Sequence, residues 1–282
     1  MKIKKQTQKT RLTSIRYGWL VVMVSLGLFT SCSKNEDANK LPYGKYPIAV
    51  MAEVDGQVLT RVAGKDAWAN DDVMAMKIGD VTKKYIFNAT TGKFSCADPF
   101  YWGSSTEKMT VDAWYPYSDV KTADVDIRVK ADQSTEANYL ESDLLEVDGG
   151  VISLVNDKVT FRHRTSKVVI NLTAKQGIDI STVGVAITNL SGVETGTDVK
   201  PHKNGNTYTA LLVPQNSSGK GFIKVTFKGV DYTYIPKTNE ASFTAGKQYT
   251  YNIAVDITGL TVTVNGATLW EQEGGVNNVQ SA

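Results

Sequence analysis

The chain has 282 residues, with 31 Lys and Arg against 29 Asp and Glu, 41% hydrophobic residues and two Cys. Ordinary apolar content and balanced charge exclude a disordered tail, a disulfide scaffold and a collagen-like fibre. All six charged residues among the first 31 are basic, which leaves 25 positive against 29 negative charges from Cys32 onward. A net charge of that sign provides no basic surface for a phosphate backbone, so we expect no nucleic-acid partner.

The N-terminus has the pattern of an export signal. A basic stretch precedes the uncharged residues 18–29, and the small residues Thr30 and Ser31 lead into Cys32. The uncharged run is too short for a membrane-spanning helix, which needs about 20 apolar residues, so residues 1–31 are predicted to be a signal peptide. Small residues before a Cys are typical of the site at which lipoprotein signal peptidase cuts. We therefore expect Cys32 to carry a lipid that holds the protein to a bilayer; the alternative is a nearby cut with Cys32 as a bystander.

The remaining Cys and the residues after Cys32 suggest no further covalent link. With Cys32 lipidated, Cys96 has no partner, so an intramolecular disulfide is excluded and Cys96 is predicted to be a small apolar filler in a strand. Residues 32–44 are polar and contain few branched apolar residues, which is typical of a flexible tether.

From Lys45 onward, apolar residues alternate with polar ones, which predicts half-buried antiparallel strands. The clearest alternating sets are Ile48/Val50/Ala52/Val54, Val168/Ile170/Leu172, Ile223/Val225/Phe227, Tyr249/Tyr251/Ile253/Val255 and Leu260/Val262/Val264. Clusters of Gly, Asn and Asp between such sets predict tight turns. These clusters are Thr91-Gly92, Asp148-Gly149-Gly150, Asn204-Gly205 and Asn265-Gly266.

The length of this β-rich region suits two domains. We predict an all-β fold of two tandem antiparallel β-sandwich (transthyretin-like) domains, residues 45–157 and 158–282, with the break near Asn156 and Asp157. A turn or two of helix is expected only within residues 134–147.

Catalytic signals are sparse. His163 and His202 both lie among basic residues, with no carboxylate nearby in sequence to orient an imidazole. Asp124 and Asp126 share one face of a predicted strand, which suits a metal or general acid but is also typical of a solvated strand face. The chain contains no phosphate-binding loop, dinucleotide fingerprint, zinc-protease motif or calcium loop. We therefore expect no enzyme activity and no cofactor, with a hydrolase using the two Asp residues as a remote alternative.

Several aromatic residues lie close together in sequence, around Trp68, Phe100-Tyr101-Trp102 and Trp114-Tyr115-Pro116-Tyr117. Exposed rings would form a carbohydrate-binding platform, because aromatic faces stack on sugars while polar atoms bind hydroxyl groups. Alternatively, rings such as Tyr101 and Trp114 fill the core. The two interpretations predict opposite burial.

A succession of short motifs resembles the fimbrillin-like, or type V pilin, family across nearly the whole chain. They are Cys32, Tyr46–Val54, Leu59–Gly64, Trp68–Val73, Phe100–Trp102, Ala113–Tyr117, Ser142–Leu145, Phe161–Val168 and Phe243–Tyr251. The order and spacing of the motifs carry the resemblance, since each is weak alone.

The resemblance implies assembly by strand exchange. Family members reach the bacterial cell surface as outer-membrane lipoproteins, and an arginine-specific protease then cuts after an Arg just beyond the first strand. Here that Arg matches Arg61, so the first strand, residues 46–54 with Ile48, Val50, Ala52 and Val54, would be removed. The alternative is that Arg61 is an ordinary surface residue.

The vacated groove would accept a strand from another fimbrial subunit, which adds backbone hydrogen bonds to the exposed sheet edge. The expected donor is residues 259–270 with Leu260, Val262 and Val264; the alternative is a last strand paired within its own domain.

The alternative function is glycan binding. On that interpretation the protein is a monomeric lipoprotein that keeps its first strand and binds glycan through Trp68, Trp102 and Trp114.

Overall fold

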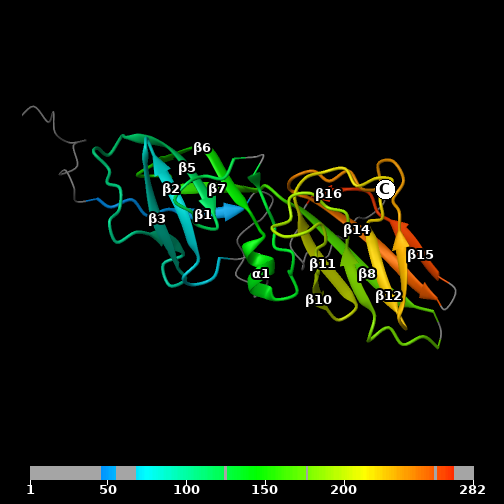
Figure 1. Cartoon of the computed structure of the whole chain (residues 1–282). Coiled ribbons are helices and arrows are strands. Elements are labelled where there is room, and N and C mark those ends of the chain that lie inside the picture. The colour runs from blue at the N-terminus through cyan, green and yellow to red at the C-terminus, as the bar shows by residue number, and fades with distance from the viewer. Residues whose placement is uncertain (1–45, 55–67, 124–125, 176, 257–258, 270–282) are drawn as a thin grey trace, which may run out of the picture. The chain divides into compact units, whose positions relative to one another are not determined.

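The structure is a computed structural model that describes residues 46–54, 68–123, 126–175, 177–256 and 259–269. The chain divides into compact units at residues 1–38 and 39–282, and every described residue lies in the second unit. As expected, this part is mostly β, with three sheets and a single short α-helix among the described residues (Figure 1). That helix is too short to cross a bilayer.

The first sheet has seven strands and nearly closes into a barrel. Its strands are β1 (Met51–Val54), β2 (Val73–Ile78), β3 (Val81–Asn88), β4 (Lys93–Ser95), β5 (Lys108–Tyr115), β6 (Leu145–Ser153) and β7 (Lys158–His163). They are ordered β1-β7-β6-β5-β2-β3-β4, so β1 and β4 are the two ends. Isolated bridges from Pro47 to Tyr101 and from Val50 to Phe94 join those ends.

The later strands form a six-stranded and a three-stranded sheet around a second core. The six-stranded sheet contains β8 (Ser166–Ala174), β10 (His202–Asn204), β11 (Thr207–Leu212), β14 (Lys247–Asp256), β15 (Gly259–Val264) and β16 (Thr268–Leu269). The three-stranded sheet contains β9 (Gly184–Ile187), β12 (Ile223–Phe227) and β13 (Val230–Tyr234). The predicted alternation is confirmed here, because the apolar sets in β8, β12 and β14 are all buried.

Two strand pairs differ from the all-antiparallel expectation. β1 runs parallel to β7, and β8 runs parallel to β14. Each pair joins strands that are far apart in sequence, and only such distant segments can pair in parallel, because a tight hairpin always reverses the chain. Alternation within one segment carries no information about the direction of its neighbour.

The first sheet continues across the predicted break at residue 157. Asn156 and Asp157 lie in the tight connection between β6 and β7, where Ser153 and Asn156 exchange backbone hydrogen bonds. Since β7 pairs with both β6 and β1, it belongs to the near-barrel.

The predicted turn at residues 148–150 is wrong, because these residues lie inside β6. They sit opposite an irregularity in the register between Val111 and Ala113 of β5. Gly149 has a φ of +62° and its N–H donates to the Asp112 carboxylate at 2.9 Å. Asp148 and Gly149 therefore form a β-bulge opposite Asp112, and Gly149 has the same positive-φ conformation that a turn uses.

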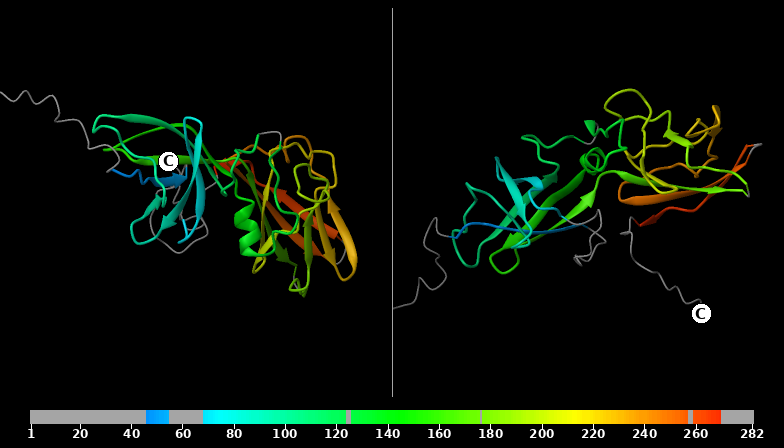
Figure 2. Two further views of the ribbon diagram at one scale, coloured as in Figure 1. Left: turned by 60° about the vertical axis from the view of Figure 1, so that its left-hand side comes forward. Right: turned by 90° about the horizontal axis from the view of Figure 1, so that it is seen from below.

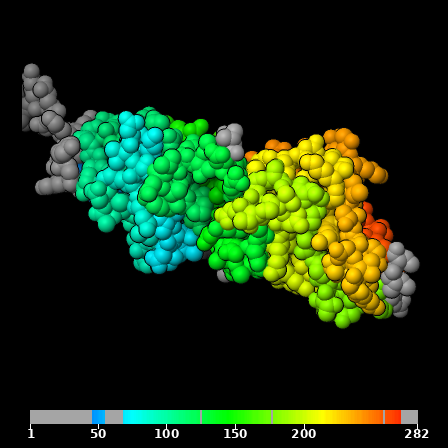
Figure 3. Space-filling view, viewed as in Figure 1, coloured from blue at the N-terminus to red at the C-terminus, as the bar shows by residue number. Residues whose placement is uncertain are grey.

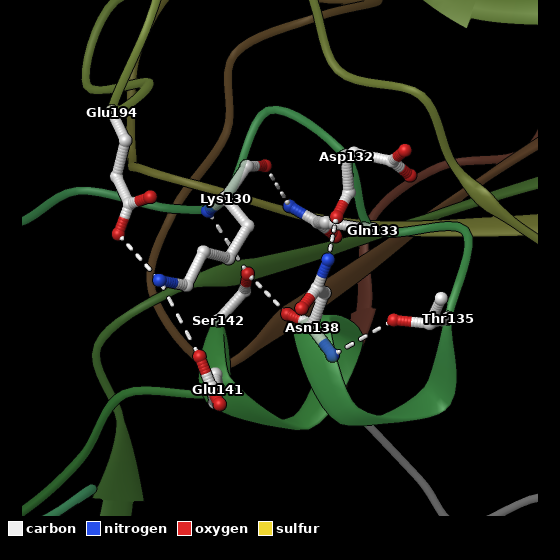
Figure 4. Close-up of polar contacts among 8 residues, drawn as sticks. All are labelled: Lys130, Asp132, Gln133, Thr135, Asn138, Glu141, Ser142 and Glu194. Atoms are coloured by element: carbon white, nitrogen blue, oxygen red, sulfur yellow. Dashed lines mark hydrogen bonds and ion pairs between the residues drawn. The ribbon is translucent and has the colours of Figure 1, made fainter.

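Helix α1 (Glu136–Glu141) is the expected short helix, and polar contacts fix it to the strand-like segment before it (Figure 4). The Thr135 hydroxyl caps the helix by accepting from Asn138 N at 3.3 Å. At the other end the Ser142 hydroxyl accepts from Lys130 N at 3.1 Å, and the Lys130 ammonium pairs with Glu194 at 3.0 Å.

Gln133 extends the six-stranded sheet through its side chain. It is fully buried, and its amide group donates to Leu211 O at 2.9 Å and accepts from Leu211 N at 2.8 Å. The side chain thus takes the place of a neighbouring strand for one residue of β11.

We expect Gln133→Ala to lower the free energy of unfolding by about 2–4 kcal/mol, since each buried backbone group left unpaired costs about 1–3 kcal/mol. Glu136→Ala, at an exposed position of α1, should change it by less than about 0.5 kcal/mol. Urea unfolding of both variants checks this, and equal stabilities would contradict the assignment.

Candidate functional site: the first strand and its slot

Residues 46–54, here called the β1 segment, lie between β4 and β7 and close the near-barrel. On one side, Met51 N donates to Asp157 O at 2.9 Å, at the start of the parallel pairing with β7. On the other side, Val50 and Phe94 exchange two backbone hydrogen bonds of 3.0 and 2.8 Å. Figure 2 shows this segment, in blue, running lengthwise beside the green strands. We call the space that it fills the slot.

The alternate side chains of the β1 segment point into the core, as the sequence predicted. Ile48, Val50, Ala52 and Val54 are 1%, 0%, 2% and 7% exposed. Burying a large aliphatic side chain stabilises a fold by about 1.5–3 kcal/mol. The β1 segment is therefore a central part of the core, although it stands at the end of the strand order. On the face shown in Figure 3, β2 and β3 lie at the surface and almost nothing of β1 is seen.

The outer face of the β1 segment carries one charged contact. The Glu53 carboxylate accepts from the Lys158 ammonium at 3.0 Å and from the Thr160 hydroxyl at 2.9 Å. Met51, two residues earlier on the same face, is 41% exposed. The inner face is thus apolar and tightly packed, while the outer face is polar and partly solvated.

Trp68 packs across the end of the slot. Its ring makes edge contacts with Phe94 of β4, Tyr115 of β5 and Phe161 of β7, with centroid distances of 4.9, 5.3 and 5.4 Å. Its indole N–H donates to Ala52 O in the β1 segment at 2.8 Å. We call these four aromatic residues the Trp68 cluster.

Asp72 supports the Trp68 cluster from the side of β2. Its carboxylate accepts from Ala69 N at 2.7 Å and from the Tyr115 hydroxyl at 3.3 Å. Burial raises the pKa of Asp72 above its ordinary value, and these two hydrogen bonds only partly oppose the effect. Burial, followed by the nearby Asp72 charge, likewise raises the pKa of Tyr115. The phenol therefore stays protonated and donates.

The structure brings together only some of the predicted site residues. Leu260, Val262 and Val264 lie in β15, which pairs with β14 of the same chain, and their side chains are half-buried against the second core. Cys32 and Arg61 lie outside the described residues. Sequence reasoning did not predict that Trp68 contacts the first strand; the only signal was a Trp just beyond the polar stretch that follows that strand.

The aromatic residues do not form the exposed platform that glycan binding would need. Trp102 is 3% and Trp114 is 5% exposed, and Trp68 is enclosed by its cluster. Tyr101, expected in the core on the alternative interpretation, is instead 41% exposed. Burial therefore favours a packing role for the three Trp residues.

The candidate catalytic residues do not assemble a reactive site. His163 does have a carboxylate neighbour, Asp143, at 2.7 Å from Nδ1, which the sequence could not predict because the two are 20 residues apart. Asp126 lies in a short 3₁₀ turn rather than on a strand, and Asp124 is outside the described residues. Within the described ranges, no group of three His, Cys, Asp or Glu residues could hold a metal ion.

The described part of the chain is mostly β, and its most elaborate feature is the strand-shaped slot in the near-barrel. The fimbrillin-like family profile matches residues 60–267, so the chain belongs to the fimbrillin-like family. It is accordingly a fimbrial protein of the cell surface and not an enzyme.

Solved structures agree on the fold. A candidate cell adhesion protein of Bacteroides uniformis superposes with a TM-score of 0.59 at 20% identity, over 82% of this chain and all of the other. One of Bacteroides ovatus gives a TM-score of 0.56 at 18% identity, over 79% of this chain and 97% of the other. A comparison with curated proteins found no match.

We expect Ile48→Ala to lower the free energy of unfolding of the uncleaved chain by about 2–5 kcal/mol, the usual cost of emptying a core position. Met51→Ala, at the exposed position three residues later, should cost less than about 0.5 kcal/mol. Denaturant titration of the two variants measures the difference. Equal effects would mean that the β1 segment is not part of the folded core.

Proposed function

We propose that this protein is a fimbrial subunit that is exported as a lipoprotein, cleaved after Arg61 and polymerised by strand exchange. The observation that carries the proposal is the position of the β1 segment, whose inner face is buried in the core although the segment lies wholly on the N-terminal side of Arg61. A cut at Arg61 would separate the segment covalently from the rest of the near-barrel. The lipid on Cys32 would hold the uncleaved precursor to the outer membrane.

Departure of the β1 segment would leave an opening that favours a replacement strand. The backbones of β4 and β7 would lose their shared neighbour, and an unpaired sheet edge readily pairs with another chain. The core side chains that contact Ile48 and Val50 would also become exposed to water. A strand from another subunit would restore both the hydrogen bonds and the burial.

The proposed donor is the segment from residue 259 to residue 270, which includes β15. Leu260, Val262 and Val264 have the two-residue spacing of Ile48, Val50 and Ala52. In its own sheet β15 is an edge strand, and these side chains are only half-buried. Inside the slot they would have a strand on either side and more complete burial, which would offset the loss of their pairing with β14.

Repeated donation from one subunit to the next is head-to-tail. Such a contact joins two different surfaces and does not close on itself, so it generates a fibre. The proposed partners are therefore other fimbrial subunits and an arginine-specific maturation protease. Adhesion through the resulting fimbria is the proposed biological role.

Cleavage at Arg61 tests the first step. Treatment of the chain from Ser33 onward with an arginine-specific protease should release residues 33–61, leave a stable core, and give SDS-resistant ladders that grow with protein concentration. The matched control is Arg61→Ala, which should stay monomeric.

The other Arg residues after Cys32 are Arg128, Arg162 and Arg164. Arg162 lies within β7, Arg164 is held by Glu146 at 3.0 Å, and the peptide bond after Arg128 is held by Val129 N, which donates to Gly192 O at 2.9 Å. All three sites should therefore resist cleavage. A cleaved product that remains a soluble, folded monomer at high concentration would overturn the proposal.

Donor residues can be tested on the same material. Val262→Asp or Val264→Asp should abolish ladder formation after cleavage, because a carboxylate on the inner face cannot enter an apolar slot. Thr263→Asp, on the exposed face of the same strand, is the control and should reduce ladders far less. Normal ladders from Val262→Asp, measured by gel and electron microscopy, would exclude β15 as the donor.

A further inference from the structure

Pairing between the β1 segment and β4 ends before the β1 segment does. The last backbone exchange joins Val50 and Phe94, and antiparallel geometry would place residue 92 opposite Ala52. Gly92 is part of the tight turn that leads into β4, with a φ of +68°, and its N–H already donates to Asn88 O at 2.9 Å. The backbone of β4 therefore offers no donor to the carbonyl of Ala52.

Trp68 supplies that missing donor from its side chain. Ala52 is 2% exposed, and a buried carbonyl without a partner would be costly. The indole N–H meets it at 2.8 Å, and the ring is fixed by Phe94 on one rim of the slot and Phe161 on the other. The donor is thus held in place by side chains that belong to the walls of the slot rather than to the segment inside it.

We propose that Trp68 is the positioning residue that selects the length of the strand taken up by the slot. This inference rests on the proposed function, because it assigns Trp68 to the incoming strand of another subunit after the β1 segment has left. Trp68 lies seven residues beyond Arg61, so it stays with the core when the chain is cut there.

The indole N–H is satisfied only by a strand that continues in extended conformation to the place of Ala52, two residues past its last pairing with β4. A shorter insert leaves the buried donor unpaired and binds less tightly. The indole N–H contacts a backbone carbonyl, so the residue at this place can have any side chain of suitable size. Trp68 therefore selects how far the strand extends and not its sequence.

A double-mutant cycle isolates the contact. The chain from Ser33 onward is nicked at Arg61, and labelled peptides then compete with the native segment for the slot. One peptide has the sequence of residues 46–54, and its analogue carries an ester in place of the amide between Ala52 and Glu53. The ester makes the carbonyl of Ala52 a weaker acceptor. It also removes the N–H of Glu53 from the peptide, but this loss is the same for every protein variant and cancels in the cycle.

The ester should weaken binding to the nicked wild-type chain about two- to tenfold more than binding to Trp68→Phe, which keeps an aromatic ring but has no N–H. Trp114→Phe removes an indole N–H that donates to Ser118 O at 3.0 Å rather than to the β1 segment, and should behave as wild type. If Trp68→Phe fails to fold, benzothienylalanine at position 68 replaces the N–H with sulfur and keeps the ring shape.

Equal ester penalties in wild type and in the Trp68 variants would overturn the role of Trp68 and leave strand exchange intact. Binding of neither peptide to the nicked wild-type chain would overturn the proposed function and this inference together. The two failures are therefore distinguishable.

Discussion

Backbone pairing of the β1 segment with β7 on one side and β4 on the other holds the near-barrel closed. The strands are ordered β1-β7-β6-β5-β2-β3-β4, and the β1 segment is the element that bridges the two ends of this order. Its buried Ile48 and Val50 also complete the core. The stability of the whole sheet thus depends on this short segment, the first that the structure describes.

Strand pairing is a tolerant form of recognition, and this explains how one site can hold a segment of its own chain or another. Backbone hydrogen bonds depend little on sequence. The inner face of the strand needs only apolar side chains of suitable size at every second position. Specificity must then come from features at the ends and on the outer face. The Trp68 indole and the Lys158–Thr160 pair opposite Glu53 are the polar groups that the slot provides.

Particular residues show where sequence reasoning succeeded and where it stopped. Alternation identified the buried faces of β1, β8, β12 and β14, because a period of two is a local property of the backbone. The cluster at residues 148–150 was wrongly assigned to a turn, since the positive φ of Gly149 serves a bulge equally well. The Asp143 partner of His163 and the parallel partners of β1 and β8 depend on chain segments brought together only by folding.

The sequence by itself determined the β-rich class, the faces that are buried, the absence of recognisable catalytic motifs and the resemblance that the family match confirmed. These properties follow from local periodicity, composition and the order of motifs along the chain. Only the tertiary structure decided that the first strand closes a sheet between β4 and β7, that Trp102 and Trp114 are buried, and that Trp68 bonds to Ala52. The reason is physical: pairing partners and burial are set by contacts between distant segments, which no local pattern encodes.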